Sequence, residues 1–137
     1  MKPSRTYELR LSEQGIDLFL ECHCRLTRLS RQFLPYGATL AVAVAALDLL
    51  SAAEVAAELE THRCRHATGS NGRFVGAPSS LARHISEIGV RLSQSPEFGS
   101  APRAASLYLA GLCSFSTFDD EQLLAILRQA MDHPPGS

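Results

Sequence analysis

Two short runs of cysteine and histidine are the residues of this chain best suited to bind a metal ion. They are Cys22-His23-Cys24 and His62-Arg63-Cys64-Arg65-His66. A zinc site needs four nitrogen or sulfur ligands that converge on one point. On a helix, the two cysteines of the first run point about 200° apart, and the cysteine of the second run points away from the face that its histidines share. The spacing therefore predicts no metal site and no other cofactor. The two histidines instead suit a helix C-terminus, where the dipole favours a protonated imidazole.

A catalytic site is equally hard to assemble from this sequence. It contains no nucleophile elbow, Walker loop, dinucleotide fingerprint or His-Glu-x-x-His pair. Gly69 and Gly72 lack the lysine and the preceding strand that a phosphate-binding loop needs. A pairing of Cys64 or Cys113 with His84 would supply a nucleophile and a base, but nothing in the spacing brings them together. We therefore expect a protein that is not an enzyme.

Arginine dominates the residues that could bind a partner. All but one of the 13 basic residues are arginine, whose planar guanidinium suits bidentate contacts with carboxylate or phosphate. One group lies on the first predicted helix, and a second lies in or beside a glycine/arginine loop expected over residues 67–79, since a long loop in a compact domain is often functional. The predicted partner- or phosphate-binding residues are Arg63, Arg65, Arg73, Arg25, Arg28 and Arg31. The alternative for each group is an ordinary solvated surface.

The charge is balanced overall but uneven along the chain. The formal net charge is −1. Basic residues outnumber acids in residues 1–36 and 62–103, whereas residues 37–61 carry four acids and no base. Alternating blocks of this kind suit a protein that pairs with itself or with a polar partner.

The start of the chain predicts a strand. Residues 5–11 alternate between apolar and polar side chains, as in a half-buried strand. We see no second convincing strand nearby. Residues 1–11 are therefore expected to form an N-terminal arm, either extended on the helices or paired with a copy of itself.

A long helix is predicted next. Ser12 is placed to cap it, and Pro35 should stop it at Phe33 or Leu34. The predicted buried stripe of this helix is Leu18, Phe19, Cys22, Leu26, Leu29 and Phe33.

The alanine-rich stretch Ala38–Leu59 organises the rest of the chain. Its first part is apolar all round, which is typical of a buried helix. The face around Val44 and Leu47 should be covered either by this chain or by another subunit. Ser51 and Glu54 have the spacing of a capping box, so the stretch forms either two helices, over about 38–50 and 52–62, or one continuous helix.

The strand-then-helix start resembles that of ribbon-helix-helix DNA-binding proteins. The residues that carry the likeness are Thr6, Glu8 and Arg10 as outward strand positions and Ser12 as the helix cap. The likeness covers about the first forty residues and departs from the family in two ways. The first helix is too long, and Pro35 follows where a Gly-x-Ser/Thr turn should begin a second helix. No residue role is transferred.

Together these patterns predict an all-α fold, a small bundle of five to six helices with a short N-terminal strand or extended arm. We expect one helical domain over residues 1–137, with a frayed tail at 133–137. The start has no apolar core of a signal peptide, and no segment is apolar for long enough to span a membrane. We therefore predict a cytoplasmic protein with reduced thiols.

The function predicted from these patterns is that of a non-enzymatic helical interaction module. It would regulate or bridge a larger macromolecular assembly, as an oligomer, with a protein partner or a copy of itself. One alternative is a nucleic-acid-binding subunit or regulator that uses the arginines of the first helix and of residues 63–73. Another is a metal-binding protein or an unrecognised enzyme.

Overall fold

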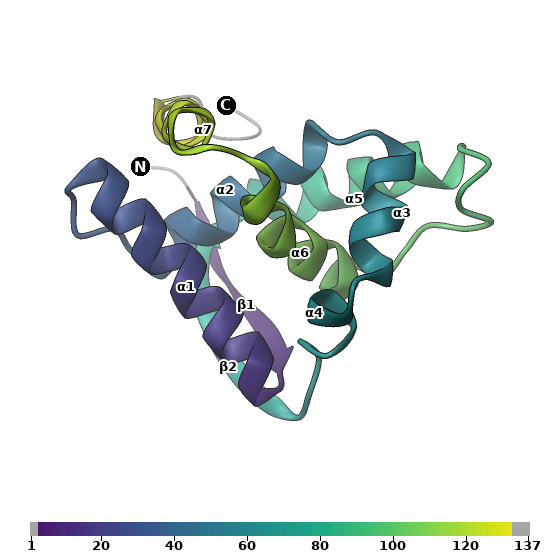
Figure 1. The fold of residues 1–137 in the computed structure, drawn as a ribbon, viewed down its shortest axis with the longest axis horizontal. Coiled ribbons are helices and arrows are strands. Elements are labelled where there is room, and N and C mark those ends of the chain that lie inside the picture. Colours follow the sequence, from purple (N-terminus) through teal and green to yellow (C-terminus); the bar gives the residue numbers. More distant parts are fainter. Residues whose placement is uncertain (1–2, 133–137) are drawn as a thin grey trace.

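The computed structural model describes residues 3–132. Within them the chain forms seven α-helices, one 3-10 helix and a two-stranded antiparallel sheet (Figure 1). In chain order the elements are β1 (Ser4–Leu11), α1 (Glu13–Ser30), α2 (Tyr36–Asp48), α3 (Ala52–Glu60), α4 (His62–Arg65), β2 (Asn71–Pro78), α5 (Ser80–Ser93), α6 (Ala104–Cys113), the 3-10 helix η1 (Ser114–Thr117) and α7 (Asp120–Asp132). The mostly helical fold with an N-terminal strand is confirmed. The helices outnumber the expected five or six because α4 forms a separate single turn. The predicted frayed tail, 133–137, lies outside the described residues.

The sheet corrects one prediction. β1 is a strand as expected, but its partner is β2, in the segment that we predicted to be a loop over 67–79. The prediction of a loop is wrong for Asn71–Pro78, because Gly72, Gly76 and Pro78 resemble turn residues until the partner strand is known. Pairing sets Tyr7 opposite Val75, and both side chains are buried.

Helix α1 begins where the sequence predicts and ends early. The Ser12 side chain accepts a hydrogen bond from the Gly15 N–H at 3.1 Å, which caps the first turn. At the other end Arg31 adopts the left-handed conformation with φ 59°, and its N–H bonds to the Thr27 carbonyl. The chain therefore leaves the helix before Phe33, which is fully exposed rather than part of the buried stripe.

Helix α2 is the centre of the fold. It packs against α1, α5, α6, α7 and β2 (Figure 1). Val44 and Leu47 have no exposed surface within this one chain, so the interpretation of a core helix is confirmed. The following stretch is a second helix, α3, because Ser51 and Glu54 form the reciprocal hydrogen bonds of a capping box.

The start of α5 is fixed by a side chain from elsewhere in the chain. Ser79 stands before α5 but makes no side-chain cap. Instead the Tyr7 hydroxyl of β1 accepts a hydrogen bond from the Ala82 N–H at 3.1 Å and donates one to the Pro78 carbonyl at 2.7 Å. The sheet therefore holds the first turn of α5.

No helix within residues 3–132 combines the length and apolar character needed to cross a bilayer.

Candidate interaction surface

The six predicted arginines do not form one site, and Arg25 is the clearest exception. Its Nε and one terminal nitrogen bond to the Asp120 carboxylate at 3.1 and 2.9 Å. The terminal nitrogens also donate to the carbonyls of Phe115 and Phe118 at 2.7 and 2.8 Å. These contacts hold α1 to η1, to the residue that follows η1 and to the start of α7. Arg25 is therefore a structural residue, and its guanidinium has little left to offer a partner.

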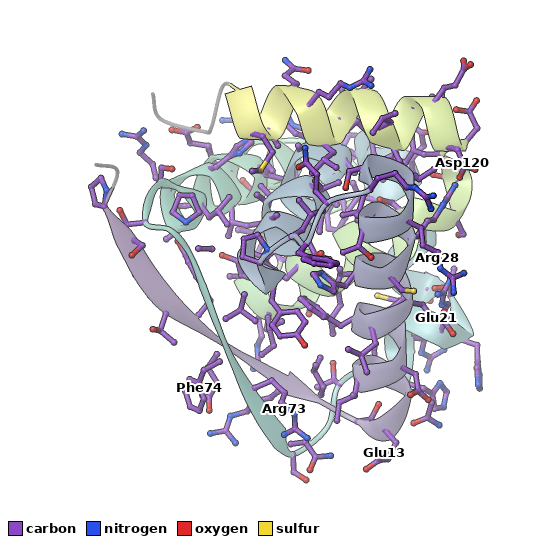
Figure 2. All side chains as sticks on the ribbon, turned by 90° about the vertical axis from the view of Figure 1, so that its left-hand side faces the viewer. Glu13, Glu21, Arg28, Arg73, Phe74 and Asp120 are labelled. Atoms are coloured by element: carbon purple, nitrogen blue, oxygen red, sulfur yellow. The ribbon has the colours of Figure 1, made fainter. Side chains whose placement is uncertain are left out.

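The three arginines of residues 63–73 also point to different places. A terminal nitrogen of Arg63 pairs with the Glu21 carboxylate of α1 at 2.8 Å. Arg65 is exposed on α4, and Arg73 lies on β2, where it bonds to the Gly72 carbonyl. Glu21 and Arg73 appear on different sides of α1 in Figure 2. Arg63 and Arg73 therefore do not form one site in this conformation.

Placement of α4 explains where Arg63 points. The Ser12 N–H at the start of α1 donates to the Ala67 carbonyl at 2.9 Å, and the Ser12 hydroxyl bonds to the His66 carbonyl. Gly15 permits this approach, because a side chain there would collide with the Ala67 carbonyl. The chain that follows α4 is thus fixed to α1, and Arg63 comes within reach of Glu21.

The exposed apolar side chains do gather on one surface. Seven large hydrophobic residues are exposed among residues 3–132, and four of them lie around α1 and the sheet. They are Leu20, Phe33, Tyr36 and Phe74, with relative residue accessibilities of 47%, 108%, 54% and 69%. We call these four residues, with Arg28, Arg31 and Arg73, the Leu20 surface.

Leu20 joins the two hollows of this surface. The smaller hollow lies between α1 and the sheet, where Leu11, Ile16, Tyr36 and Phe74 also line it. Its volume is about 210 Å³, less than the roughly 300 Å³ at which small-molecule pockets begin. Figure 2 shows Arg73 and Phe74 on the ribbon that faces α1 across this region. A side chain of another protein would fit this space better than a small ligand.

The second hollow lies at the end of α1. It is lined by Leu20, Arg28, Arg31 and Phe33, among others, and no acidic residue lines either hollow in the described part of the chain. Within residues 3–132 neither Arg28, Arg31 nor Arg73 forms an ion pair, so their charges face outward uncompensated. The surface thus combines apolar contact area with a basic rim.

Polar contacts behind the surface hold Tyr36 in place. The His23 Nδ1 bonds to the buried Thr39 hydroxyl at 2.7 Å, and the His23 ring lies 4.6 Å from the Tyr36 ring. Burial lowers the pKa of His23, because the charged imidazolium would lose its hydration there. The first turn of α2 is therefore fastened to α1 by a neutral histidine.

The cysteines and histidines lie apart from this surface, except for Cys24 and His23 at the second hollow. Cys64 and Cys113 are buried free thiols, and hydrogen bonding from the Cys113 thiol lowers the pKa of Cys64. The same bond and burial raise the pKa of Cys113. Within residues 3–132 no three His, Cys, Asp or Glu side chains are grouped to hold a metal ion.

Sequence reasoning missed the apolar half of the surface. Leu20 carried a signal, because it lies off the buried stripe of α1 at a position that should be polar. Phe74 alternates with buried Val75, which has meaning only once β2 is recognised. Comparison of the chain with protein-family models, with curated proteins and with solved structures finds no match.

Proposed function

We propose that this chain is a non-enzymatic helical interaction module that binds protein through the Leu20 surface. In that role it regulates or bridges a larger macromolecular assembly, as an oligomer in a reducing cytoplasm. The observation that carries the proposal is the gathering of Leu20, Phe33, Tyr36 and Phe74 around two hollows with a basic rim. Contiguous exposed apolar patches mark interaction sites. Tyrosine, phenylalanine and arginine are the residues enriched in such interfaces.

The nucleic-acid alternative is less well supported. Binding to a phosphate backbone requires several cations on one surface, because each neutralised phosphate contributes only part of the affinity. Arg25 and Arg63 already contact carboxylates within the chain. The net charge of −1 also supplies no general attraction to a polyanion. We therefore place nucleic-acid binding second.

The proposal is tested with a double substitution, Leu20→Ser with Phe33→Ser. The matched control is Leu49→Ser with Val90→Ser, because Leu49 and Val90 are also exposed large hydrophobic residues but do not line either hollow. Both variants should keep the helical circular dichroism spectrum. Proteins that co-purify with the wild-type chain from its native host should be retained by the control and lost by the surface variant.

Two outcomes would contradict the proposal. The same partners could be retained by both variants, which would show that the Leu20 surface does not bind them. Alternatively, the wild-type chain could shift mixed-sequence DNA or RNA at physiological salt, with a strong loss of affinity as salt rises. The second outcome would favour the nucleic-acid alternative.

A further inference from the structure

The exposed face of α1 carries acids toward one end and arginines toward the other. Side chains spaced three or four residues apart share one face of a helix. The exposed stripe of α1 is Glu13, Asp17, Leu20, Cys24, Arg28 and Arg31, the last being the C-cap residue. Glu21 is also exposed beside this stripe, but its carboxylate is already paired with Arg63 of the same chain. Figure 2 shows Glu13 at one end of the helix and Arg28 near the other. α1 also forms an outer edge of the molecule (Figure 1), so this stripe is accessible to a partner.

The charged residues of the stripe are arranged almost symmetrically about Cys22, with the acids before it and the arginines after it. Glu13 and Arg31 each lie nine residues from Cys22, and Leu20 and Cys24 each lie two residues from it. Asp17 lies five residues before Cys22, and Arg28 lies six residues after it. Reversing the direction of the helix therefore exchanges each acid with an arginine and leaves the apolar centre in place.

From this pattern we infer that two copies of the chain pair through α1, antiparallel, about a two-fold axis near Cys22. Asp17 then lies beside the partner's Arg28, and the axis repeats this contact in the other direction. Leu20 packs against the partner's Cys24 at the centre. The inference rests on the proposed function and identifies the partner as a second copy.

The same antiparallel pairing explains why the Phe33 ring is exposed in a single copy. This residue follows the C-terminal end of α1, so antiparallel pairing brings it to the N-terminal end of the partner's α1, which the partner's Leu11 precedes. Leu11 lines the smaller hollow with Ile16 and Phe74. The fully exposed Phe33 ring of one copy then has an apolar space in the other copy, which completes the Leu20 surface.

The mixed charge of the stripe favours a second copy over a uniformly charged partner. A polyanion or an acidic protein would attract Arg28 but would be repelled by Asp17. Neither residue forms an ion pair within residues 3–132. They cannot pair along the same helix either, since eleven residues of helix span about 16 Å. Only a partner with the opposite order of charge satisfies both, and a reversed copy has that order.

The test uses charge reversal in the full chain. Asp17→Arg and Arg28→Asp should each weaken the dimer at least about tenfold, because the two-fold axis turns one substitution into two repulsive contacts. The double variant, Asp17→Arg with Arg28→Asp, should restore the wild-type affinity, and so should an equimolar mixture of the two single variants. Sedimentation equilibrium at low salt measures the dissociation constants, and circular dichroism confirms that each variant is folded. Added salt should weaken the wild-type dimer.

Several results would overturn the inference. A wild-type chain that stays monomeric at all concentrations excludes self-pairing, and the proposed function then stands or falls on the partners lost by the Leu20 and Phe33 variant. A dimer that tolerates both single reversals uses another surface. A folded double variant that stays monomeric excludes the Asp17 to Arg28 register. A dimer lost only on substitution of Leu20 and Phe33 keeps the proposed function and excludes the charge pairing.

Discussion

Gly111 of α6 lies so close to Ala43 of α2 that no side chain fits between the two helices. A methyl group at Gly111 would collide with the Ala43 carbonyl and would lie 3.2 Å from the Ala43 Cβ. Close approach of this kind requires small residues on both sides, and the alanine-rich composition of α2 supplies them. The crossing of these two buried helices therefore depends on a single missing methyl group.

We expect Gly111→Ala to destabilise the protein. Alanine in place of a helical glycine normally adds up to about 1 kcal/mol of stability. At this position the collision is with backbone, so overpacking should instead cost about 1–3 kcal/mol. Gly89→Ala in α5 is the matched control, since its nearest neighbours are at 3.7 and 3.9 Å, and it should stabilise. Chemical denaturation measures both changes, and a stabilising Gly111→Ala would contradict the packing described.

Leu47→Asp should cost several kcal/mol, because it buries an unpaired carboxylate in a helix that has no exposed surface at that position. Leu49→Asp lies two residues later, where the side chain is largely exposed, and should change the free energy of unfolding by about 0.5 kcal/mol or less. Urea titrations of the two variants give the comparison. Similar midpoints for both would show that α2 is not the core helix.

Arg25→Ala should lower the free energy of unfolding by about 1–3 kcal/mol, because two carbonyls and the Asp120 carboxylate lose a charged donor. Arg25→Lys should recover only part of this loss, since an ammonium group cannot make the same forked contacts. Arg65→Ala is the control, because Arg65 is exposed on α4. Thermal unfolding of the three variants, at a concentration where association is negligible, separates a structural arginine from a surface one. An Arg25→Ala variant as stable as Arg65→Ala would contradict the role assigned to it.

At concentrations where the chain is monomeric, one thiol of the native protein should react rapidly with a disulfide reagent. Cys24 is the exposed cysteine among the four, whereas the thiols of Cys22, Cys64 and Cys113 are buried. Burial also raises the pKa of Cys22 to about 12, which removes its thiolate at neutral pH. Cys24→Ser should abolish the rapid phase, and the remaining three should react only on unfolding. A rapid phase that survives in Cys24→Ser would place a second thiol at the surface.

Stability should fall as the pH drops below the ordinary pKa of histidine, in part because of His23. Its pKa is lowered from 6.5 in the folded chain, so the unfolded chain binds the proton more readily. The contribution of His23 is therefore complete above about pH 6.5 and is lost as the pH falls through the folded pKa. His23→Asn should show a smaller fall in melting temperature over this range. Identical pH profiles for the two proteins would exclude His23 as a source of the dependence.

Local patterns predicted those elements whose signals lie within a few residues. The Ser51 and Glu54 capping box predicted the break between α2 and α3, and the Ser12 cap predicted the start of α1. The apolar surround of α2 predicted its burial. Each of these depends on neighbours in the same helix, where spacing alone determines geometry.

Features set by distant contacts were not predictable in this way. β2 is recognisable as a strand only beside β1, because its own glycines suggest a loop. The partners of Arg25 and Arg63 are Asp120 and Glu21, far away in the sequence, so their engagement could not be inferred from spacing. The candidate surface was half predicted: Arg28, Arg31 and Arg73 were named, while its apolar residues were missed.

The pairing of β1 with β2 also has a consequence for biosynthesis. The two strands close a loop of roughly sixty residues that contains four helices, and such closure costs little free energy but slows folding. On the ribosome β1 emerges well before β2, so the nascent chain presents an unpaired strand until residues 71–78 leave the exit tunnel. During that interval the side chains of Tyr7, Leu9 and Leu11 are exposed to solvent, and a neighbouring nascent chain can pair with the open edge of β1. Translation speed between the two strands therefore sets how long each new chain is exposed to misassembly.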